Sequence, residues 1–143
     1  MSNVCLDKTF GEMQYKHRWF KESTLFLFGE KWKIKIAAKA YNGNPITNEQ
    51  RNSYTKFRLD ESQICDLVSE SIKAYVNDAV DCNRLHIKVD DQNDLAKIVF
   101  PRTLLFDIDG TSILLFDCIW DQEMGIAVEF YPELKIGPQD LFL

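Results

Sequence analysis

Cysteine and histidine are the residue types in this chain that could bind a transition metal. The sequence holds four cysteines and two histidines: Cys5, Cys65, Cys82, Cys118, His17 and His86. No two cysteines form a Cys-x-x-Cys pair, and neither histidine lies at zinc-finger spacing from a cysteine. We therefore expect no metal site and no cofactor. We expect the cysteines to be mostly buried thiols in a reducing compartment.

A second group of potential ligands is the acidic stretch Asp90-Asp91-Gln92-Asn93-Asp94. Its side-chain oxygens suit calcium, but the stretch lacks the glycine and the terminal glutamate of an EF-hand loop. The sequence therefore predicts a polar loop at this position.

Two carboxylates follow an apolar run in the segment Leu104-Leu-Phe-Asp107-Ile-Asp109-Gly-Thr111. The segment resembles the first motif of the haloacid dehalogenase phosphatases, in which Asp107 would be the nucleophile and Asp109 the general acid, with magnesium nearby. The context disagrees with that family, whose remaining motifs need a far longer stretch than the 32 residues after Thr111. Asp109-Gly110 instead has the composition of a two-residue hairpin turn.

The sequence contains no other recognisable catalytic set. Neither histidine has a nearby serine or cysteine in a nucleophile motif, and no glycine-rich phosphate loop occurs. Glu123 lies near Trp120 and Asp121 and could act as an acid or base. In a short turn, however, Asp121 more often accepts hydrogen bonds from backbone amides. The chain is therefore predicted not to be an enzyme.

Charge is distributed unevenly along the chain. Residues 1–59 hold eleven Lys/Arg and five Asp/Glu, a net charge of +6, whereas residues 60–143 hold six and seventeen, a net charge of −11. The acidic part disfavours nucleic acid as a partner, because phosphate binding needs clustered positive charge. It suits a basic protein partner. The alternative is that the charge only keeps the protein soluble.

Membrane insertion and secretion are not expected. No apolar run approaches the roughly 20 residues that a membrane helix needs. Residues 1–10 lack the basic and apolar regions of a secretory signal. The expected location is the cytoplasm.

The elements that position these residues begin with strands over residues about 8–41. Gly29-Glu30 fits a hairpin turn, and apolar residues then alternate with lysines over residues 31–38. This period of two predicts a strand with one buried face and one lysine-lined face. The lysine face could attract an anion, but such lysines more often form a solvated face that prevents sheet-to-sheet aggregation.

Two consecutive helices are predicted over residues about 48–80. Thr47 and Gln50 have capping-box spacing, which predicts a first helix from about Asn48 to Arg58, and Asp60 and Gln63 repeat the pattern. Apolar residues of the second helix recur at spacings of three and four, which predicts a stripe packed on the sheet. These residues are Ile64, Leu67, Val68, Ile72, Tyr75, Val76, Ala79 and Val80.

Strands return over residues about 95–143. The predicted strand runs are Ile98–Phe100, Thr103–Ile108, Ile113–Trp120, Ile126–Phe130 and Leu134–Ile136, with a weaker edge strand at Leu85, Ile87 and Val89. Residues 121–125 would form a five-residue connection. Separate blocks of strands and helices predict an α+β fold, an antiparallel β-sheet with two consecutive helices packed on one face, in a single domain over residues 1–143.

The end of the chain carries a further pattern. Trp120-Asp121-x-Glu123-x-Gly125-Ile-Ala-Val128 is followed by Ile136-Gly137-x-Gln139-Asp140-x-x-Leu143. The pattern resembles the tail of small bacterial proteins that are similar to immunity proteins of toxin systems, including contact-dependent inhibition. The resemblance implies a non-enzymatic bacterial immunity protein that binds and neutralises a cognate toxin domain such as a basic nuclease. The alternative is a ligand-binding or scaffold domain.

Residues of two kinds are candidates for the site. The partner contact is predicted on acidic residues of the second helix and of the acidic loop: Asp60, Glu61, Asp66, Glu70, Asp90, Asp91 and Asp94. The tail motif is predicted to be mainly structural: Trp120 and Asp121 hold the hairpin, Gly125 and Gly137 adopt positive φ, and Gln139 and Asp140 satisfy backbone groups.

Overall fold

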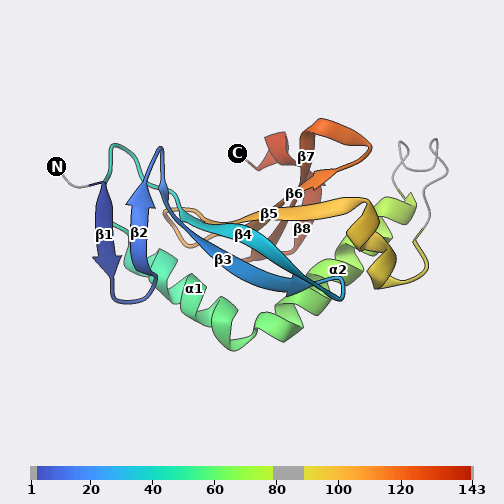
Figure 1. The fold of residues 1–143 in the computed structure, drawn as a ribbon, viewed down its shortest axis with the longest axis horizontal. Helices are drawn as coiled ribbons and strands as arrows, with labels where there is room; N and C mark the ends of the chain where they lie inside the picture. Colours follow the sequence, from blue (N-terminus) through green and yellow to red (C-terminus); the bar gives the residue numbers. More distant parts are fainter. Residues whose placement is uncertain (1–2, 79–88, 143) are drawn as a thin grey trace.

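The described chain begins and ends with strands, and its two α-helices lie between them (Figure 1). The computed structural model describes residues 3–78 and 89–142. The elements in chain order are β1 (Val4–Asp7), β2 (Gly11–Tyr15), β3 (Trp19–Leu27), β4 (Glu30–Ala38), α1 (Asn48–Leu59), α2 (Glu61–Asp78), the 3-10 helix η1 (Gln92–Lys97), β5 (Val99–Phe106), β6 (Ser112–Cys118), β7 (Asp121–Tyr131), β8 (Lys135–Pro138) and the 3-10 helix η2 (Gln139–Leu141).

The eight strands form one sheet in the order of the sequence, from β1 to β8. Neighbouring strands are antiparallel except for the central pair, β4 and β5, which is parallel. The exception follows from the connection, because α1 and α2 carry the chain back across the sheet before β5 begins. The predicted α+β fold is confirmed. The sequence predicted an antiparallel sheet, and the structure adds one parallel pair to it.

Both helices lie on the same side of the sheet (Figure 1). The main core fills the space between the helices and the sheet. Phe10 stacks on Tyr54 of α1 with 4.5 Å between ring centroids, and Phe106 of β5 meets both rings edge-on. A smaller cluster lies on the opposite face of the sheet. Its buried members are Ala37, Leu105, Ile113, Leu115 and Ala127.

The apolar stripe of α2 is confirmed in its centre and wrong at one edge. Val68, Ile72 and Val76 are buried, but Leu67 is 45% exposed. Ser69 takes an inward position instead, because its hydroxyl donates to the carbonyl of Cys65 at 2.8 Å and so remains hydrogen-bonded. The predicted positions Ala79, Val80, Leu85 and Ile87 lie outside the described residues.

The lysine-lined strand is confirmed as β4. Ile34 and Ile36 are buried, whereas Lys31, Lys33 and Lys35 are exposed. The turn before it consists of Phe28 and Gly29, with φ of 55° and 76°, one residue earlier than predicted. Positive φ at both positions is the geometry that a tight hairpin requires.

The connection between β6 and β7 is shorter than the five residues predicted. Cys118 pairs with Asp121, so the turn is Ile119-Trp120 and residues 121–125 belong to β7. The register shifts between Phe116 and Cys118, and Gly125 has a φ of 66°. The glycine and its polar neighbours therefore mark a bulge within a strand rather than a loop.

β5 is also continuous where two strand runs were predicted. Its register shifts between Pro101 and Thr103, and an irregularity of this kind accommodates a residue that lacks a backbone N–H. The predicted hairpin at Asp109-Gly110 is confirmed, since β5 and β6 pair antiparallel around it. Its connection is longer than the predicted two-residue turn, because β5 ends at Phe106 and β6 begins at Ser112.

The described residues contain no helix that is long and apolar enough to cross a membrane. Within the same residues, no group of three or more His, Cys, Asp and Glu side chains could hold a metal ion. No disulfide joins Cys5, Cys65 and Cys118, and Cys82 lies outside the described residues.

Candidate functional site

Four of the predicted contact residues lie at the junction of α1 and α2 and along α2. Asp60 is the C-cap of α1, where its backbone N–H donates to the Lys56 carbonyl at 3.1 Å. Glu61 opens α2, where a negative charge interacts favourably with the helix N-terminus. Asp66 and Glu70 are exposed further along the same helix. The junction therefore presents carboxylates to solvent.

The acidic stretch at residues 90–94 is not simply a loop, because η1 begins within it. The Asp91 carboxylate accepts a hydrogen bond from the Asn93 amide at 2.9 Å, and the Asp94 carboxylate accepts one from the Asp91 amide at 3.3 Å. Reciprocal bonds of this kind form a capping box. Two of the three predicted carboxylates thus have a structural task, and Asp90 remains exposed.

A groove of about 400 Å³ brings α2 and η1 together with the tip of the β3–β4 hairpin. Glu61, Cys65 and Asp66 line it from α2, and Asn93 lines it from η1. A Cβ atom on Gly29 would collide with the Asn93 side chain, so η1 lies directly against the hairpin tip. Folding therefore places the acidic residues of α2 beside the acidic segment at residues 90–94.

Phe26 gives this groove an apolar component. Its side chain is 62% exposed, although most large apolar side chains of the sheet are buried. Phe26 lines the groove together with Glu61 and Asp66. Aromatic residues are enriched at the centre of protein interfaces, with charged residues at the rim. We refer to Phe26, Glu61 and Asp66 as the acidic groove.

Cys65 lines the same groove, with its thiol in the protonated form at neutral pH. Burial, reinforced by the negative charges of Glu61 and Asp66, raises the pKa of its thiol to about 12. The reactive form of cysteine is the thiolate, which is scarce at neutral pH when the pKa is so high. The Cys65 thiol is therefore a poor nucleophile at neutral pH.

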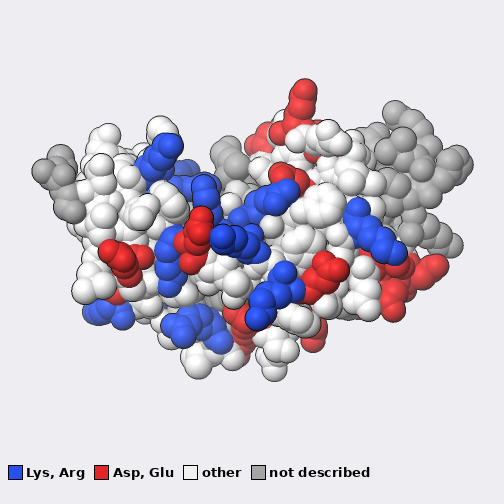
Figure 2. Space-filling view, in the orientation of Figure 1, with Lys and Arg blue, Asp and Glu red and all other residues white. Residues whose placement is uncertain are grey.

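Charge is unevenly distributed on the face of the folded molecule that Figure 2 shows. Lys and Arg atoms are most numerous over β2–β4, and one group of Asp and Glu atoms lies near the end of the molecule where η1 and α2 lie, although acidic atoms occur elsewhere on this face as well. Lys31, Lys33 and Lys35 contribute to the basic region. A partner approaching the η1 end therefore meets negative potential.

The carboxylates of Asp107 and Asp109 lie in the β5–β6 turn. Asp107 accepts a hydrogen bond from the Ile108 amide at 2.7 Å, and Asp109 accepts one from the Thr111 amide at 2.9 Å. The bond from Thr111 lowers the pKa of Asp109. The chain runs directly into β6 after this turn, whereas the phosphatases that the segment resembles continue into a helix. Both carboxylates have a turn-stabilising role.

The first half of the tail motif shapes the β6–β7 hairpin. Trp120 is half-buried in the turn and packs against the main core. The Asp121 carboxylate accepts a hydrogen bond from the Met124 amide at 3.0 Å, and Glu123 is exposed. A Cβ on Gly125 would collide with the carbonyl oxygen of Phe116, so the bulge requires glycine.

The second half of the motif supports that bulge from η2. The Gln139 amide donates to the Phe116 carbonyl at 2.9 Å, a group that the irregular β6–β7 pairing leaves available. Asp140 is exposed. Gly137 is absent from the residues with positive φ, contrary to the prediction. Its small size instead leaves room for Leu141, which would lie 3.2 Å from a Cβ at this position.

Comparison with known proteins identifies a family for nearly the whole chain. Residues 9–143 match the family described as "Domain of unknown function (DUF6985)". The chain belongs to this family. No curated protein matches the chain, and no solved structure matches it. The DUF6985 match spans β2 to η2, so it includes the acidic groove and the tail motif, while β1 precedes it.

Sequence reasoning found Gln50 as a capping residue but missed its wider role in this DUF6985 domain. Its side chain is fully buried, accepts a hydrogen bond from the Thr47 amide at 2.9 Å, and donates to the carbonyls of Lys39 and Phe106 at 2.8 and 3.1 Å. One amide thus joins the start of α1 to the ends of β4 and β5. The capping pattern predicted only the local bond.

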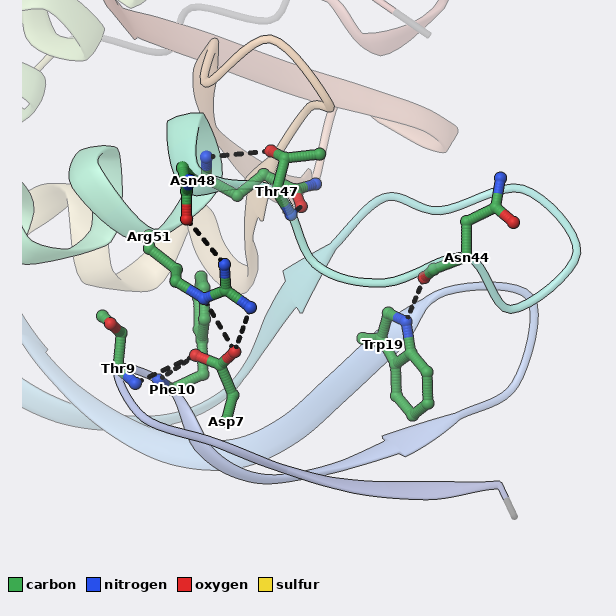
Figure 3. A network of polar contacts seen from close by, with 9 residues as sticks. Asp7, Thr9, Phe10, Trp19, Asn44, Thr47, Asn48 and Arg51 are labelled. Atoms are coloured by element: carbon green, nitrogen blue, oxygen red, sulfur yellow. Dashed lines mark hydrogen bonds and ion pairs between the residues drawn. The ribbon is translucent and has the colours of Figure 1, made fainter. Parts of the chain in front are cut away.

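A buried ion pair that the sequence did not predict fastens the N-terminal hairpin to α1 (Figure 3). The Arg51 guanidinium contacts the Asp7 carboxylate at 2.8 Å, and the same carboxylate accepts bonds from the amides of Thr9 and Phe10. Burial alone would raise the pKa of Asp7, but these bonds and the Arg51 charge outweigh it and the net shift is downward. The two residues are 44 positions apart, so no local pattern signals the pair.

Proposed function

We propose that this DUF6985 protein is a non-enzymatic binding protein, a bacterial immunity protein that binds and neutralises a toxin domain in the cytoplasm. The resemblance of the tail motif supports the class of protein. The single observation that carries the choice of surface is the acidic groove, which exposed Phe26 lines together with Glu61 and Asp66.

The groove suits a basic protein partner for two reasons. Phe26 offers an aromatic surface that can be buried against the partner, which is the typical source of affinity at an interface. Glu61 and Asp66 offer negative charge that steers a basic partner and selects against acidic ones. A basic nuclease would present the required lysines and arginines, because it must bind phosphates.

The test begins with a pull-down from lysate of the native host with the purified protein as bait, at about 0.1 M and 0.5 M salt. Each captured protein is then expressed in cells with and without this protein. We expect a captured protein that stops growth alone and permits growth when this protein is present. We also expect weaker capture at the higher salt, because the Debye length falls well below 10 Å.

Substitutions in the groove locate the contact. We expect Phe26→Ser and the double substitution Glu61→Gln/Asp66→Asn each to weaken the captured complex at least about tenfold, equivalent to 1.4 kcal/mol. Glu133→Gln is the matched control, because this exposed carboxylate pairs with Lys135 beyond β7, away from the groove. Captured proteins that are harmless to cells, or an equal effect of the control, would contradict the proposal.

A further inference from the structure

A second cavity, of about 540 Å³, lies on the face of the sheet opposite the helices. The β2–β3 turn, β3, β4 and β5 enclose it. Its cationic lining residues are Lys16, Arg18, Lys35 and Lys39, and its apolar lining residues are Phe20 and Leu105. His17 completes the lining at the turn, where its φ is 68°. We refer to this site as the basic cavity.

No acidic residue lines the basic cavity in the part of the chain that the structure describes. Glu22 of β3 is the cross-strand neighbour of Lys35, but its carboxylate pairs with Lys33 at 3.7 Å. The ion pairs formed among residues 3–78 and 89–142 involve Lys33, Arg51, Arg102 and Lys135, none of which lines the cavity. Four cations that converge without a carboxylate raise the local concentration of anions. The site therefore favours a ligand with several negative charges.

Arg18 makes the preference for an anion stronger. The side chain is half-buried, and this burial lowers the pKa of its guanidinium, which nevertheless stays protonated at neutral pH. A cation withdrawn from water is unfavourable unless an anion or hydrogen bonds compensate. The planar fork of a guanidinium binds phosphate or carboxylate oxygens in pairs. A bound phosphate would accept hydrogen bonds from this guanidinium.

The apolar lining residues of the basic cavity favour a ligand that also has an uncharged part. Phe20 lies beside the buried cluster that includes Ala37 and Leu105, so its ring forms a firm surface. The ammonium of Lys35 lies over that ring, 5.1 Å from its centroid. An aromatic face next to cations can stack a flat ring while the cations hold its charged substituent. The volume also falls in the range of small-molecule sites.

We propose that the basic cavity binds a phosphorylated small molecule that carries a flat aromatic group, of the nucleoside diphosphate type. Arg18, Lys35 and the neighbouring lysines hold the phosphates, and Phe20 stacks on the aromatic group. The basic cavity and the acidic groove use opposite ends of β3: Phe20 and Phe26 are roughly 20 Å apart at about 3.3 Å per residue. The two proposals can therefore succeed or fail separately.

The test is calorimetric titration of the full chain at about 0.15 M salt without divalent metal, with ADP, adenosine and inorganic pyrophosphate as probes. We expect ADP to bind at least about tenfold more tightly than either adenosine or pyrophosphate, because only ADP uses both parts of the cavity. Phe20→Leu should weaken ADP binding and leave pyrophosphate binding unchanged.

Charge variants identify the residues responsible. We expect Arg18→Gln and Lys35→Gln each to weaken ADP binding about tenfold or more. Lys31→Gln is the matched control, because it removes an exposed lysine from the same face of β4 outside the cavity and should change nothing. Lys35 is exposed, so its variant keeps the test valid even if Arg18→Gln fails to fold.

Several results would overturn the proposal. ADP that produces no binding signal at millimolar concentration would do so, as would ADP binding no tighter than pyrophosphate. An equal loss with Lys31→Gln would show a diffuse charge effect instead of a site. A single-stranded oligonucleotide that binds more tightly than ADP through the same residues would replace the small-molecule site with a nucleic-acid surface. Phe26→Ser should leave ADP binding intact.

Discussion

Gln50 is the residue on which the docking of α1 depends. Replacement by leucine keeps the side-chain size but removes the bonds of Gln50 to the Lys39 carbonyl and the Thr47 amide. The Phe106 carbonyl also loses a bond but keeps the one from the Lys39 amide at 2.9 Å. A buried polar group without a partner costs about 1–3 kcal/mol. We therefore expect Gln50→Leu to lower the free energy of unfolding by roughly 2–4 kcal/mol in urea titrations. Exposed Asn52→Ala on the same helix should change it by less than about 0.5 kcal/mol.

Asp7 makes the stability of the folded protein depend on pH. Its folded pKa lies below the ordinary value, so its contribution to stability is fully present above about pH 4 and is lost as the pH falls through the folded pKa. We expect Asp7→Asn to destabilise the protein by roughly 1–3 kcal/mol at pH 7 and by much less at pH 2. Urea titrations at both values check this. A difference from the native chain that stays constant with pH would contradict the assigned role.

At the scale of elements, the bulge between β6 and β7 decides how the last strands pair. Gly125→Ala must adopt a φ near 66° and place a Cβ against the Phe116 carbonyl, so we expect a loss of roughly 2–4 kcal/mol in unfolding free energy. Gly43→Ala is the matched control: its φ is 72°, but no atom lies within 4 Å of the new Cβ. It should cost only about 1 kcal/mol. Equal losses would mean that φ alone, and not the close approach, requires glycine at 125.

Some strands and helices could be predicted from sequence patterns alone. The lysine alternation of β4 and the capping box of α1 depend on neighbours within a few residues, and both were predicted correctly. The β6–β7 turn was misplaced because a bulge and a loop have the same composition of glycine and polar residues. Only pairing with Phe116 distinguishes them. Leu67 was misplaced because a spacing of three or four residues fits both the centre and the edge of a helical stripe.

For the whole molecule, Cys65 serves as a reporter of unfolding. Its thiol is 7% exposed and has a pKa of about 12, so the folded protein holds about a thousandfold fewer thiolates at this site than an ordinary cysteine would. We expect iodoacetamide to label Cys65 only as fast as the protein unfolds, and to label half-buried Cys5 sooner. Mass spectrometry of the two peptides with and without urea measures this. Equally fast labelling of both in native buffer would contradict it.

Only some residues of the two candidate sites could be predicted from the sequence. The acidic residues were found because their type is visible. The lysine face of β4 was also found, but the sequence favoured a solvated face there over an anion-binding one. The neighbours of the acidic residues in space were not visible: Phe26 precedes Glu61 by 35 positions and Asn93 follows it by 32 positions, yet both line the same groove. Likewise, Lys16 and Arg18 meet Lys35 and Leu105 only after β2–β5 pair.

The sequence by itself determined the α+β class, the order of strands and helices, and most strand and helix positions, because hydrophobic period, capping residues and turn residues act over a few positions. It also determined that charge is uneven along the chain. The tertiary structure alone decided that β4 and β5 are parallel, that Asp7 meets Arg51, and that two oppositely charged sites lie at opposite ends of β3. Those contacts join residues far apart in the chain, so their energies depend on the packing of the complete fold and leave no local pattern.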